Sequence, residues 1–160
     1  CGQVGRPGTG LHPLRGQNNV QGASDAGLIP MFYPDYKPVD SGEQIARYET
    51  FWDQTLDQQR GLTVVEITDA MADGSIKAVY IMGENPAMSD PDQHHARTGL
   101  ANLQHLVVQD LFVTETAQFA DVILPASAWP EKNGTVTNTD GRVIDINQAN
   151  GFCEDHFAKW

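Results

Sequence analysis

Residues 76–82 read Ile-Lys-Ala-Val-Tyr-Ile-Met and are followed at once by Gly-Glu-Asn-Pro at 83–86. Two more short apolar runs, Leu106–Val108 and Val122–Leu124, follow at intervals that leave room for helices. Short β-branched runs that alternate with helices predict parallel strands that are buried on both faces. Because right-handed crossovers join such strands, we expect their carboxyl ends to meet at one edge of the sheet.

A first helix is predicted before these strands. Ser41–Gln44 has the pattern of a capping box, and the apolar periodicity that follows it continues until Gly61. Phe51 and Trp52 lie in the amphipathic part of this segment, so we expect both side chains to belong to the core.

Three further helices are predicted around the strands. Thr63–Glu66 is a second capping box, and its helix is expected to end at Gly74. After the first strand a helix is expected to begin at Asp90, and after the second strand a short one at Thr114.

The C-terminal part carries a hairpin signal, because Thr135–Thr139 and Arg142–Ile146 flank the turn dipeptide Asp140-Gly141. The fold class is therefore predicted to be α/β: a small parallel, Rossmann-like three-layer sandwich with a long Gly/Pro-rich N-terminal loop and a C-terminal β-hairpin. The expected domains are the loop at 1–40, a nucleotide-binding α/β domain at 41–125, and a segment with the edge loop and hairpin at 126–160.

Composition excludes several classes of function. The chain has 160 residues with 10 Lys+Arg and 21 Asp+Glu, which gives a net charge of −11. Its apolar runs are much shorter than the roughly 20 residues of a membrane-spanning helix. The acidic balance argues against a nucleic-acid surface, although backbone amides and helix N-termini can still bind the phosphates of a nucleotide.

The cysteines and the N-terminus bear on the compartment. Cys1 and Cys153 are too few for a metal site or for a secreted disulfide framework. No apolar segment follows a basic N-terminus, so we expect no signal peptide and a cytoplasmic protein. The chain opens with Cys within a glycine-rich stretch, which we interpret as a piece cut from a longer polypeptide.

Ligands of an open parallel sheet bind beyond the carboxyl ends of the strands. The residue types there suit a nucleotide. Asp110 can accept hydrogen bonds from a ribose or a guanine edge, and Asn85 can both donate and accept. Thr114 and Thr116 can donate to a pyrophosphate, and Lys132 supplies a positive charge.

The alternative interpretation is ordinary capping and turn chemistry, with Asn85-Pro86 as a turn, Thr114 as an N-cap and Asp110 as a strand end. No phosphate-binding lysine motif or defensible Ser/His/Asp arrangement is found in the sequence. The adjacent His94 and His95 point about 100° apart on a helix and cannot bind one metal together. The residues alone therefore predict a nucleotide-binding domain without a catalytic centre.

Several blocks of the sequence resemble formate dehydrogenase large subunits of the molybdopterin oxidoreductase (dimethyl sulfoxide reductase) family. They follow one another in the order that the family has and extend from residue 2 to about 143. The blocks are Gly5–Gly10 with Pro13–Gly22, Tyr80–Pro86, Val107–Phe112 with Thr114–Thr116, Ala120–Pro125 and Glu131–Thr139.

This resemblance implies an enzyme that oxidises formate to carbon dioxide at a molybdenum or tungsten ion held by molybdopterin guanine dinucleotides. Electrons would leave through iron–sulfur clusters, and the partners would be other domains of the subunit and electron-transfer subunits. In the family the Cys or selenocysteine metal ligand and the catalytic His and Arg lie upstream of the matching region. We therefore expect this piece to be inactive alone and to contain no catalytic or metal-binding residue.

The resemblance also assigns cofactor contacts by position. They fall on Asn85, Gln109, Asp110, Lys132 and Asp155. The loop from Arg15 to Asp25 resembles a segment that packs close to the cofactor, which adds Gln17 and Asn19. Two alternatives stay open: another oxidoreductase of the family, such as a nitrate reductase, and a non-catalytic binding or assembly module of the same fold.

Overall fold

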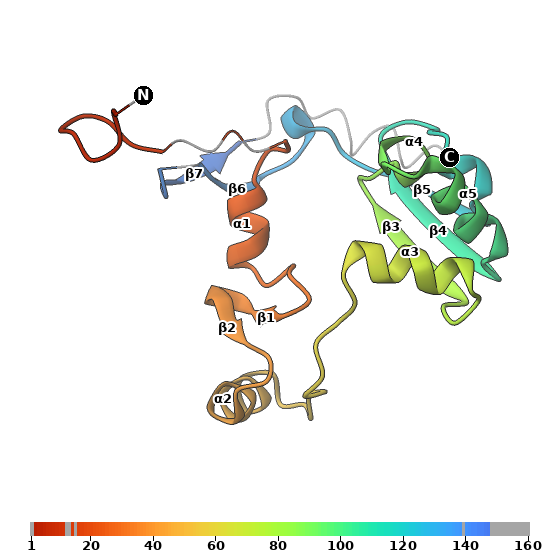
Figure 1. The fold of residues 1–160 in the computed structure, drawn as a ribbon, viewed down its shortest axis with the longest axis horizontal. Coiled ribbons are helices and arrows are strands. Elements are labelled where there is room, and N and C mark those ends of the chain that lie inside the picture. The colour runs from red at the N-terminus through yellow and green to blue at the C-terminus, as the bar shows by residue number, and fades with distance from the viewer. Residues whose placement is uncertain (1, 12–13, 15, 139, 148–160) are drawn as a thin grey trace. The chain divides into compact units, whose positions relative to one another are not determined.

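The structure is a computed structural model that describes residues 2–11, 14, 16–138 and 140–147 (Figure 1). These residues divide into two compact units. Unit 1 consists of the residues up to Gly61 together with Asn133–Asn147, and unit 2 consists of Leu62–Lys132. Each unit has a core of its own.

Unit 2 is built on the sheet that the apolar runs predict. Its strands are β3 (Ala78–Met82), β4 (His105–Asp110) and β5 (Val122–Pro125), and they lie in the order β3-β4-β5 (Figure 1). Both pairings are parallel. The predicted parallel sheet is therefore confirmed, and the carboxyl ends of the strands share one edge.

The helix before this sheet begins as its capping box predicts. In α3 (Val64–Ala72) the Thr63 hydroxyl accepts a hydrogen bond from the Glu66 amide at 3.4 Å, and the Glu66 carboxylate accepts one from the Thr63 amide at 2.8 Å. The helix ends at Ala72, and Asp73 separates it from Gly74. Gly74 has a positive φ of 81°, a conformation that favours glycine.

The helices after β3 and β4 differ from their predicted bounds. A short α4 (Pro86–Ser89) comes first, and α5 (Gln93–Asn102) begins later than Asp90 because the Asp92 carboxylate caps it by accepting from the His95 amide at 3.0 Å. The helix predicted from Thr114 is only a single 3-10 turn, η2 (Ala117–Phe119). A second such turn, η3 (Trp129–Glu131), follows β5.

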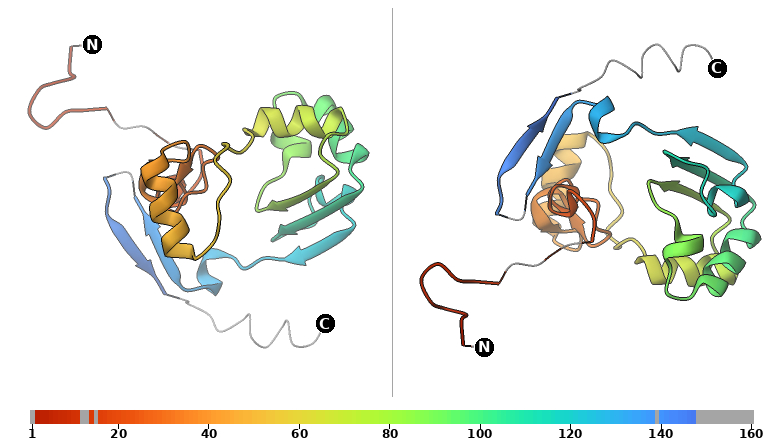
Figure 2. Two further views of the ribbon diagram at one scale, coloured as in Figure 1. Left: turned by 90° about the horizontal axis from the view of Figure 1, so that it is seen from below. Right: turned by 90° about the horizontal axis from the view of Figure 1, so that it is seen from above.

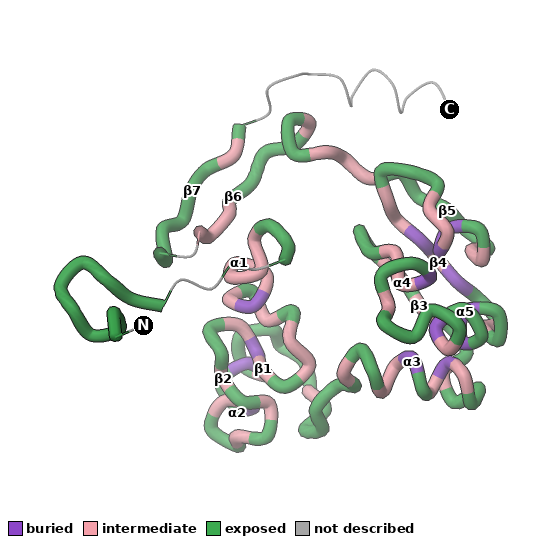
Figure 3. The backbone as a smooth tube through the Cα atoms, turned by 45° about the horizontal axis from the view of Figure 1, so that its top comes forward, coloured by how far each residue is buried: buried purple, intermediate pink, exposed green. Residues whose placement is uncertain are grey.

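The core of unit 2 lies between the helices and one face of the sheet (Figure 2). Its buried residues are Met71, Ala87, Leu100, Leu106, Val108 and Ala117. On the other face Tyr80, Met82, Val122 and Leu124 are exposed. In Figure 3 the buried part of this sheet lies in β4.

The predicted three-layer sandwich with both sheet faces buried is therefore wrong for the described part of the chain, in which unit 2 has two layers. An apolar strand shows that both of its faces are suited to burial. The strand's own sequence does not determine whether a second element covers each face.

Unit 1 contains short elements where a continuous loop was predicted. They are α1 (Val20–Asp25), β1 (Phe32–Tyr33), η1 (Pro34–Tyr36) and β2 (Lys37–Pro38), followed by α2 (Gly42–Trp52) and the hairpin of β6 (Gly134–Thr137) and β7 (Val143–Ile146). The loop prediction is thus wrong for Val20–Asp25 and for residues 32–38, because two-residue strands and a six-residue helix are too short to create periodicity. The antiparallel C-terminal hairpin is confirmed.

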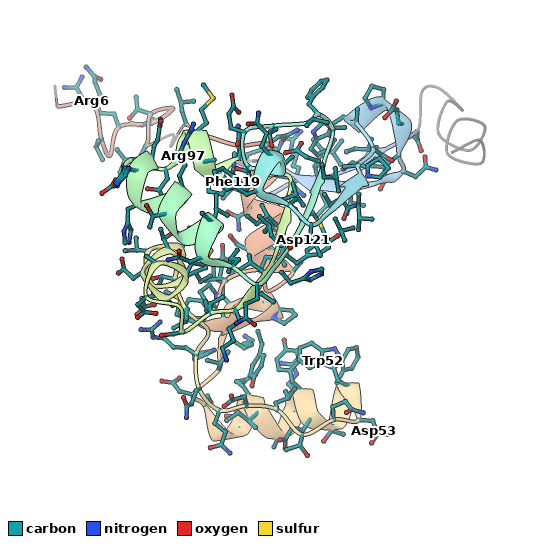
Figure 4. All side chains as sticks on the ribbon, turned by 90° about the vertical axis from the view of Figure 1, so that its right-hand side faces the viewer. Arg6, Trp52, Asp53, Arg97, Phe119 and Asp121 are labelled. Carbon is teal, nitrogen blue, oxygen red and sulfur yellow. The ribbon has the colours of Figure 1, made fainter. Side chains whose placement is uncertain are left out.

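The helix α2 is shorter than its sequence predicts. It ends at Trp52 because Asp53 adopts a left-handed conformation with φ of 52°, and both residues lie at this end in Figure 4. Its N-cap residue Ser41 makes no side-chain capping bond. The core of unit 1 comprises Tyr33, Ile45 and Tyr48. Phe51 is 77% exposed and Trp52 is 40% exposed, so the assignment of both side chains to the core is wrong, although the Trp52 ring contacts those of Tyr33 and Tyr48.

Candidate functional site

An open cavity of about 440 Å³ lies at the carboxyl edge of the sheet in unit 2. All three strand ends contribute to it, as expected for an open parallel sheet. Its lining residues are Met82, Gly83, Gln109, Asp110, Leu111, Ala126, Ser127, Ala128, Trp129 and Lys132.

The floor of this cavity is held by backbone hydrogen bonds that continue the sheet beyond its strands. The Gly83 amide donates to the Gln109 carbonyl at 2.9 Å, and the Ala126 amide donates to the Asp110 carbonyl at 3.1 Å. Gly83 has a φ of 66°, which favours glycine, whereas a Cβ there would meet nothing within 4 Å. The glycine is therefore needed for its conformation and not for space.

Two polar side chains at the end of β4 line the cavity. Gln109 and Asp110 are both half-buried. The side-chain oxygen Oε1 of Gln109 accepts a hydrogen bond from the Tyr80 hydroxyl, and one carboxylate oxygen of Asp110 accepts from the Leu111 amide at 2.6 Å. No other described residue donates to the Asp110 carboxylate, so its second oxygen can accept from a ligand.

The cation of the site follows the 3-10 turn η3. The Ala128 amide donates to the Glu131 carboxylate at 2.8 Å, which closes this turn. Lys132 is the C-cap residue of this turn and has an extended backbone, with φ of −140° and ψ of 158°. Lys132 follows Trp129 by three residues, and its ammonium nitrogen lies 5.0 Å from the centroid of the Trp129 ring.

Trp129 was not identified from the sequence as a site residue. The signal was the nearness of an aromatic residue and a lysine in Trp129-Pro-Glu-Lys132, where the proline favours the start of a tight turn. Asp110 and Lys132, 22 positions apart in the chain, do line the same cavity, as the nucleotide interpretation requires.

Asn85 lies beside this site in a network within unit 2 and is not one of the cavity-lining residues. Its side-chain oxygen accepts from the amide and the hydroxyl of Thr116, at 3.1 and 2.7 Å, and its amide nitrogen donates to the Glu115 carboxylate at 2.7 Å. The Thr116 hydroxyl in turn accepts from the Ala87 amide at 3.0 Å. This network fixes the loop after β3 to the segment that follows β4.

The network also affects the acidity of Glu115. The hydrogen bond from the Asn85 amide is the main cause that lowers the pKa of this carboxyl below its ordinary value of 4.5. A bond from its own backbone amide acts in the same direction, partial burial opposes it, and Arg97 adds a smaller favourable charge.

The Thr114 side chain bonds the backbone of the turn that follows it, although Thr114 is not the N-cap residue of that turn. Its hydroxyl accepts a hydrogen bond from the amide of Ala117, the first residue of η2, at 3.3 Å, whereas the N-cap position of η2 belongs to Thr116. Thr116 is fully buried and has no surface for a ligand to contact. The predicted contact of Thr114 with a pyrophosphate therefore stays a prediction without support from the geometry.

The remaining predicted site residues are Gln17, Asn19 and Asp155. Gln17 and Asn19 belong to unit 1, where the Asn19 side-chain oxygen accepts from the Thr137 amide at 2.9 Å and ties the start of α1 to β6. Asp155 lies outside the described residues. The cofactor contacts expected of these three residues stay predictions.

Among the described residues, no three His, Cys, Asp or Glu side chains gather where they could hold a metal ion. No helix among them has the length and apolar character needed to cross a membrane.

Comparison with known proteins gives one family. The family model named molybdopterin oxidoreductase matches residues 1–152. The chain is 51% identical over 148 residues to the F420-dependent formate dehydrogenase subunit alpha of Methanocaldococcus jannaschii. The aligned region covers 92% of this chain and 22% of that protein.

Two further relatives carry similar names. The F420-dependent formate dehydrogenase 1 subunit alpha of Methanococcus maripaludis is 46% identical over 159 residues, or 99% of this chain and 23% of that protein. Formate dehydrogenase H of Escherichia coli is 39% identical over 140 residues, or 87% of this chain and 20% of that protein. The chain thus spans about a fifth of the length of these relatives.

Proposed function

Because this chain belongs to the molybdopterin oxidoreductase family, we propose that it contributes to binding a molybdopterin guanine dinucleotide within a formate dehydrogenase alpha subunit. The observation that carries the proposal is the cavity at the carboxyl edge of the sheet. Gln109 and Asp110 from β4 and Lys132 from the segment after β5 line it together.

The residues present fit the nucleotide end of such a cofactor. The cavity of about 440 Å³ lies within the range of about 300–1,000 Å³ that is usual for small-molecule sites. The Asp110 carboxylate only accepts hydrogen bonds, and a guanine edge offers adjacent N–H donors. The Lys132 ammonium supplies donors and a positive charge for phosphate oxygens.

Formate is the proposed substrate of the complete subunit, because the relatives are named for its dehydrogenation. Oxidation of formate to carbon dioxide releases two electrons and a proton, and taking up the electrons is the chemistry that the metal of the cofactor supplies. In this proposal the residues of the chain hold and orient the nucleotide. We propose that the 160 residues alone do not oxidise formate and that iron–sulfur clusters lie elsewhere in the complete enzyme.

Equilibrium dialysis of the chain against GDP and ADP tests the nucleotide site. We expect GDP to bind more tightly, because adenine lacks the adjacent N–H pair that a carboxylate accepts. Asp110→Asn should reduce the preference for GDP by about tenfold or more, since hydrogen bonds to charged groups contribute about 1.5–3 kcal/mol.

Asp145→Asn is the matched control, because it makes the same change at an exposed residue of β7. It should leave the preference for GDP unchanged. If the unaltered chain binds neither nucleotide, or if Asp110→Asn keeps the full preference, the proposed site is wrong.

A further inference from the structure

We propose that Trp129 is a positioning residue that holds the Lys132 ammonium in place for the phosphate groups of the nucleotide. This inference rests on the proposed function and adds a residue that the family resemblance did not assign. Trp129 would act through Lys132 by a cation–π contact, and it is not proposed as a contact for the guanine base.

The geometry of the pair supports this role. The Lys132 nitrogen lies 5.0 Å from the ring centroid, inside the limit of about 6 Å for attraction between a cation and an aromatic face. Among the residues that the structure describes, no carboxylate forms an ion pair with Lys132. The indole ring is thus the described group that fixes this ammonium.

The lysine needs such a partner because its side chain is exposed and flexible. Lys132 is exposed, and holding a free lysine side chain in one rotamer costs up to about 2 kcal/mol of conformational entropy. A contact with the ring restricts the side chain before a ligand arrives. Because an ammonium carries three donors, it can remain over the ring and still donate to phosphate oxygens.

The short turn η3 separates the two members of the pair by only two residues. Pro130 restricts the backbone of η3, and the Glu131 carboxylate accepts from the Ala128 amide at 2.8 Å. Lys132 follows directly as the extended C-cap of this turn, and its ammonium nitrogen lies 5.0 Å from the centroid of the Trp129 ring. Both residues line the cavity that contains Asp110, so the charge is fixed on the side where a ligand would enter.

The experiment compares the affinities of the chain for GDP and for guanosine, measured by isothermal titration calorimetry. The dissociation constant for guanosine divided by that for GDP measures the contribution of the phosphate groups to binding. Trp129→Leu should lower this ratio by about two- to fivefold, the range expected of an exposed cation–π contact. The affinity of the Trp129→Leu variant for guanosine should stay unchanged, because the contacts with the base are unaltered.

Trp129→Phe and Lys132→Ala are the companion variants. The phenyl ring keeps an aromatic face, so Trp129→Phe should retain most of the ratio. This variant also serves as a control for loss of folding caused by replacing the indole ring. Lys132→Ala should lower the ratio at least as far as Trp129→Leu does. The double variant with both substitutions should have the same ratio as Lys132→Ala alone.

Three results would overturn the inference, and they differ from one another. Equal weakening of GDP and guanosine by Trp129→Leu would identify Trp129 as a structural or base-stacking residue. An unchanged ratio in Trp129→Leu, together with a lowered ratio in Lys132→Ala, would show that Lys132 binds the phosphate groups without being positioned by Trp129. Failure of the unaltered chain to bind GDP would remove the proposed function and this inference together.

Discussion

Thr116 combines complete burial with a hydroxyl that is used twice. It donates to the Asn85 side-chain oxygen at 2.7 Å and accepts from the Ala87 amide at 3.0 Å. Through these bonds one residue connects the loop after β3 with the segment after β4. The rim of the cavity therefore depends on a side chain that no ligand can contact.

Replacement of this residue tests the strength of the network. Thr116→Val keeps the shape of the side chain but leaves the buried Ala87 amide without its acceptor. We expect the free energy of unfolding, measured in urea, to fall by about 1–3 kcal/mol. Thr98→Val is the matched control, because its hydroxyl is exposed and only bonds the His94 carbonyl of its own helix. A change in the control as large as that in Thr116→Val would contradict the argument.

Glu115 makes the stability of the same network depend on pH. The pKa of Glu115 is lowered in the folded state, mainly by the hydrogen bond from Asn85. The ionised carboxylate therefore stabilises the fold when the pH is above 4.5, the ordinary pKa of this group. This contribution disappears as the pH falls through the lowered pKa. The stability difference between the unaltered chain and Glu115→Gln should therefore shrink between about pH 6 and pH 3.

Urea denaturation across this pH range measures the difference. Asn85→Ala should remove the same pH-dependent part, because the amide that lowers the pKa is then absent. If both variants keep the acid dependence of the unaltered chain, the hydrogen bond from Asn85 does not set the acidity of Glu115.

At the scale of elements, α3 and α5 approach each other closely at Gly99. A Cβ at this position would lie 2.9 Å from the Met71 Cβ and 3.3 Å from the Thr68 carbonyl oxygen. Glycine within a helix costs about 1 kcal/mol relative to alanine. The close helix contact is the reason that the sequence tolerates this cost.

Gly99→Ala should accordingly destabilise the chain despite the better helix propensity of alanine. Overpacking of about 1–3 kcal/mol exceeds the gain of up to about 1 kcal/mol. Gly42→Ala, in the first turn of α2, is the control: a Cβ there would meet nothing within 4 Å, and stability should be unchanged or higher. Thermal unfolding of both variants decides the matter, and a Gly99→Ala variant as stable as the parent chain would refute the close contact.

At the scale of the whole molecule, the chain has two cores in two units. Leu106 and Val108 belong to the core of unit 2, whereas Tyr33, Ile45 and Tyr48 form that of unit 1. Cores that share no residues are expected to open separately, as local unfolding units do. This separation leads to a prediction for hydrogen exchange.

Leu106→Ala removes a side chain that is buried to 99%, and such a change costs about 2–5 kcal/mol in a packed core. We expect amide protection to fall in β3, β4 and β5 and to persist in α2. Ile45→Ala, the counterpart in unit 1, should lower protection in α2 and leave the sheet unaffected. Hydrogen exchange followed by mass spectrometry measures both, and an equal loss in both units for either variant would show a single cooperative unit.

The sequence by itself determined the features whose signals are local. The strand Ala78–Met82, the capping box of Thr63 and the C-terminal hairpin each depend on residues close together in the chain, so their patterns predicted them. The meeting of Asp110 and Lys132 at one cavity was also predictable, because parallel strands end at a common edge.

Only the tertiary structure decided which groups satisfy one another across the chain. The side chain of Asn85 bonds residues about 30 positions away, and no local pattern distinguishes that use from binding a ligand. The exposure of Tyr80 on one sheet face depends in the same way on which elements pack there. Burial and hydrogen bonding are properties of a side chain's surroundings, and those surroundings are assembled from distant segments when the chain folds.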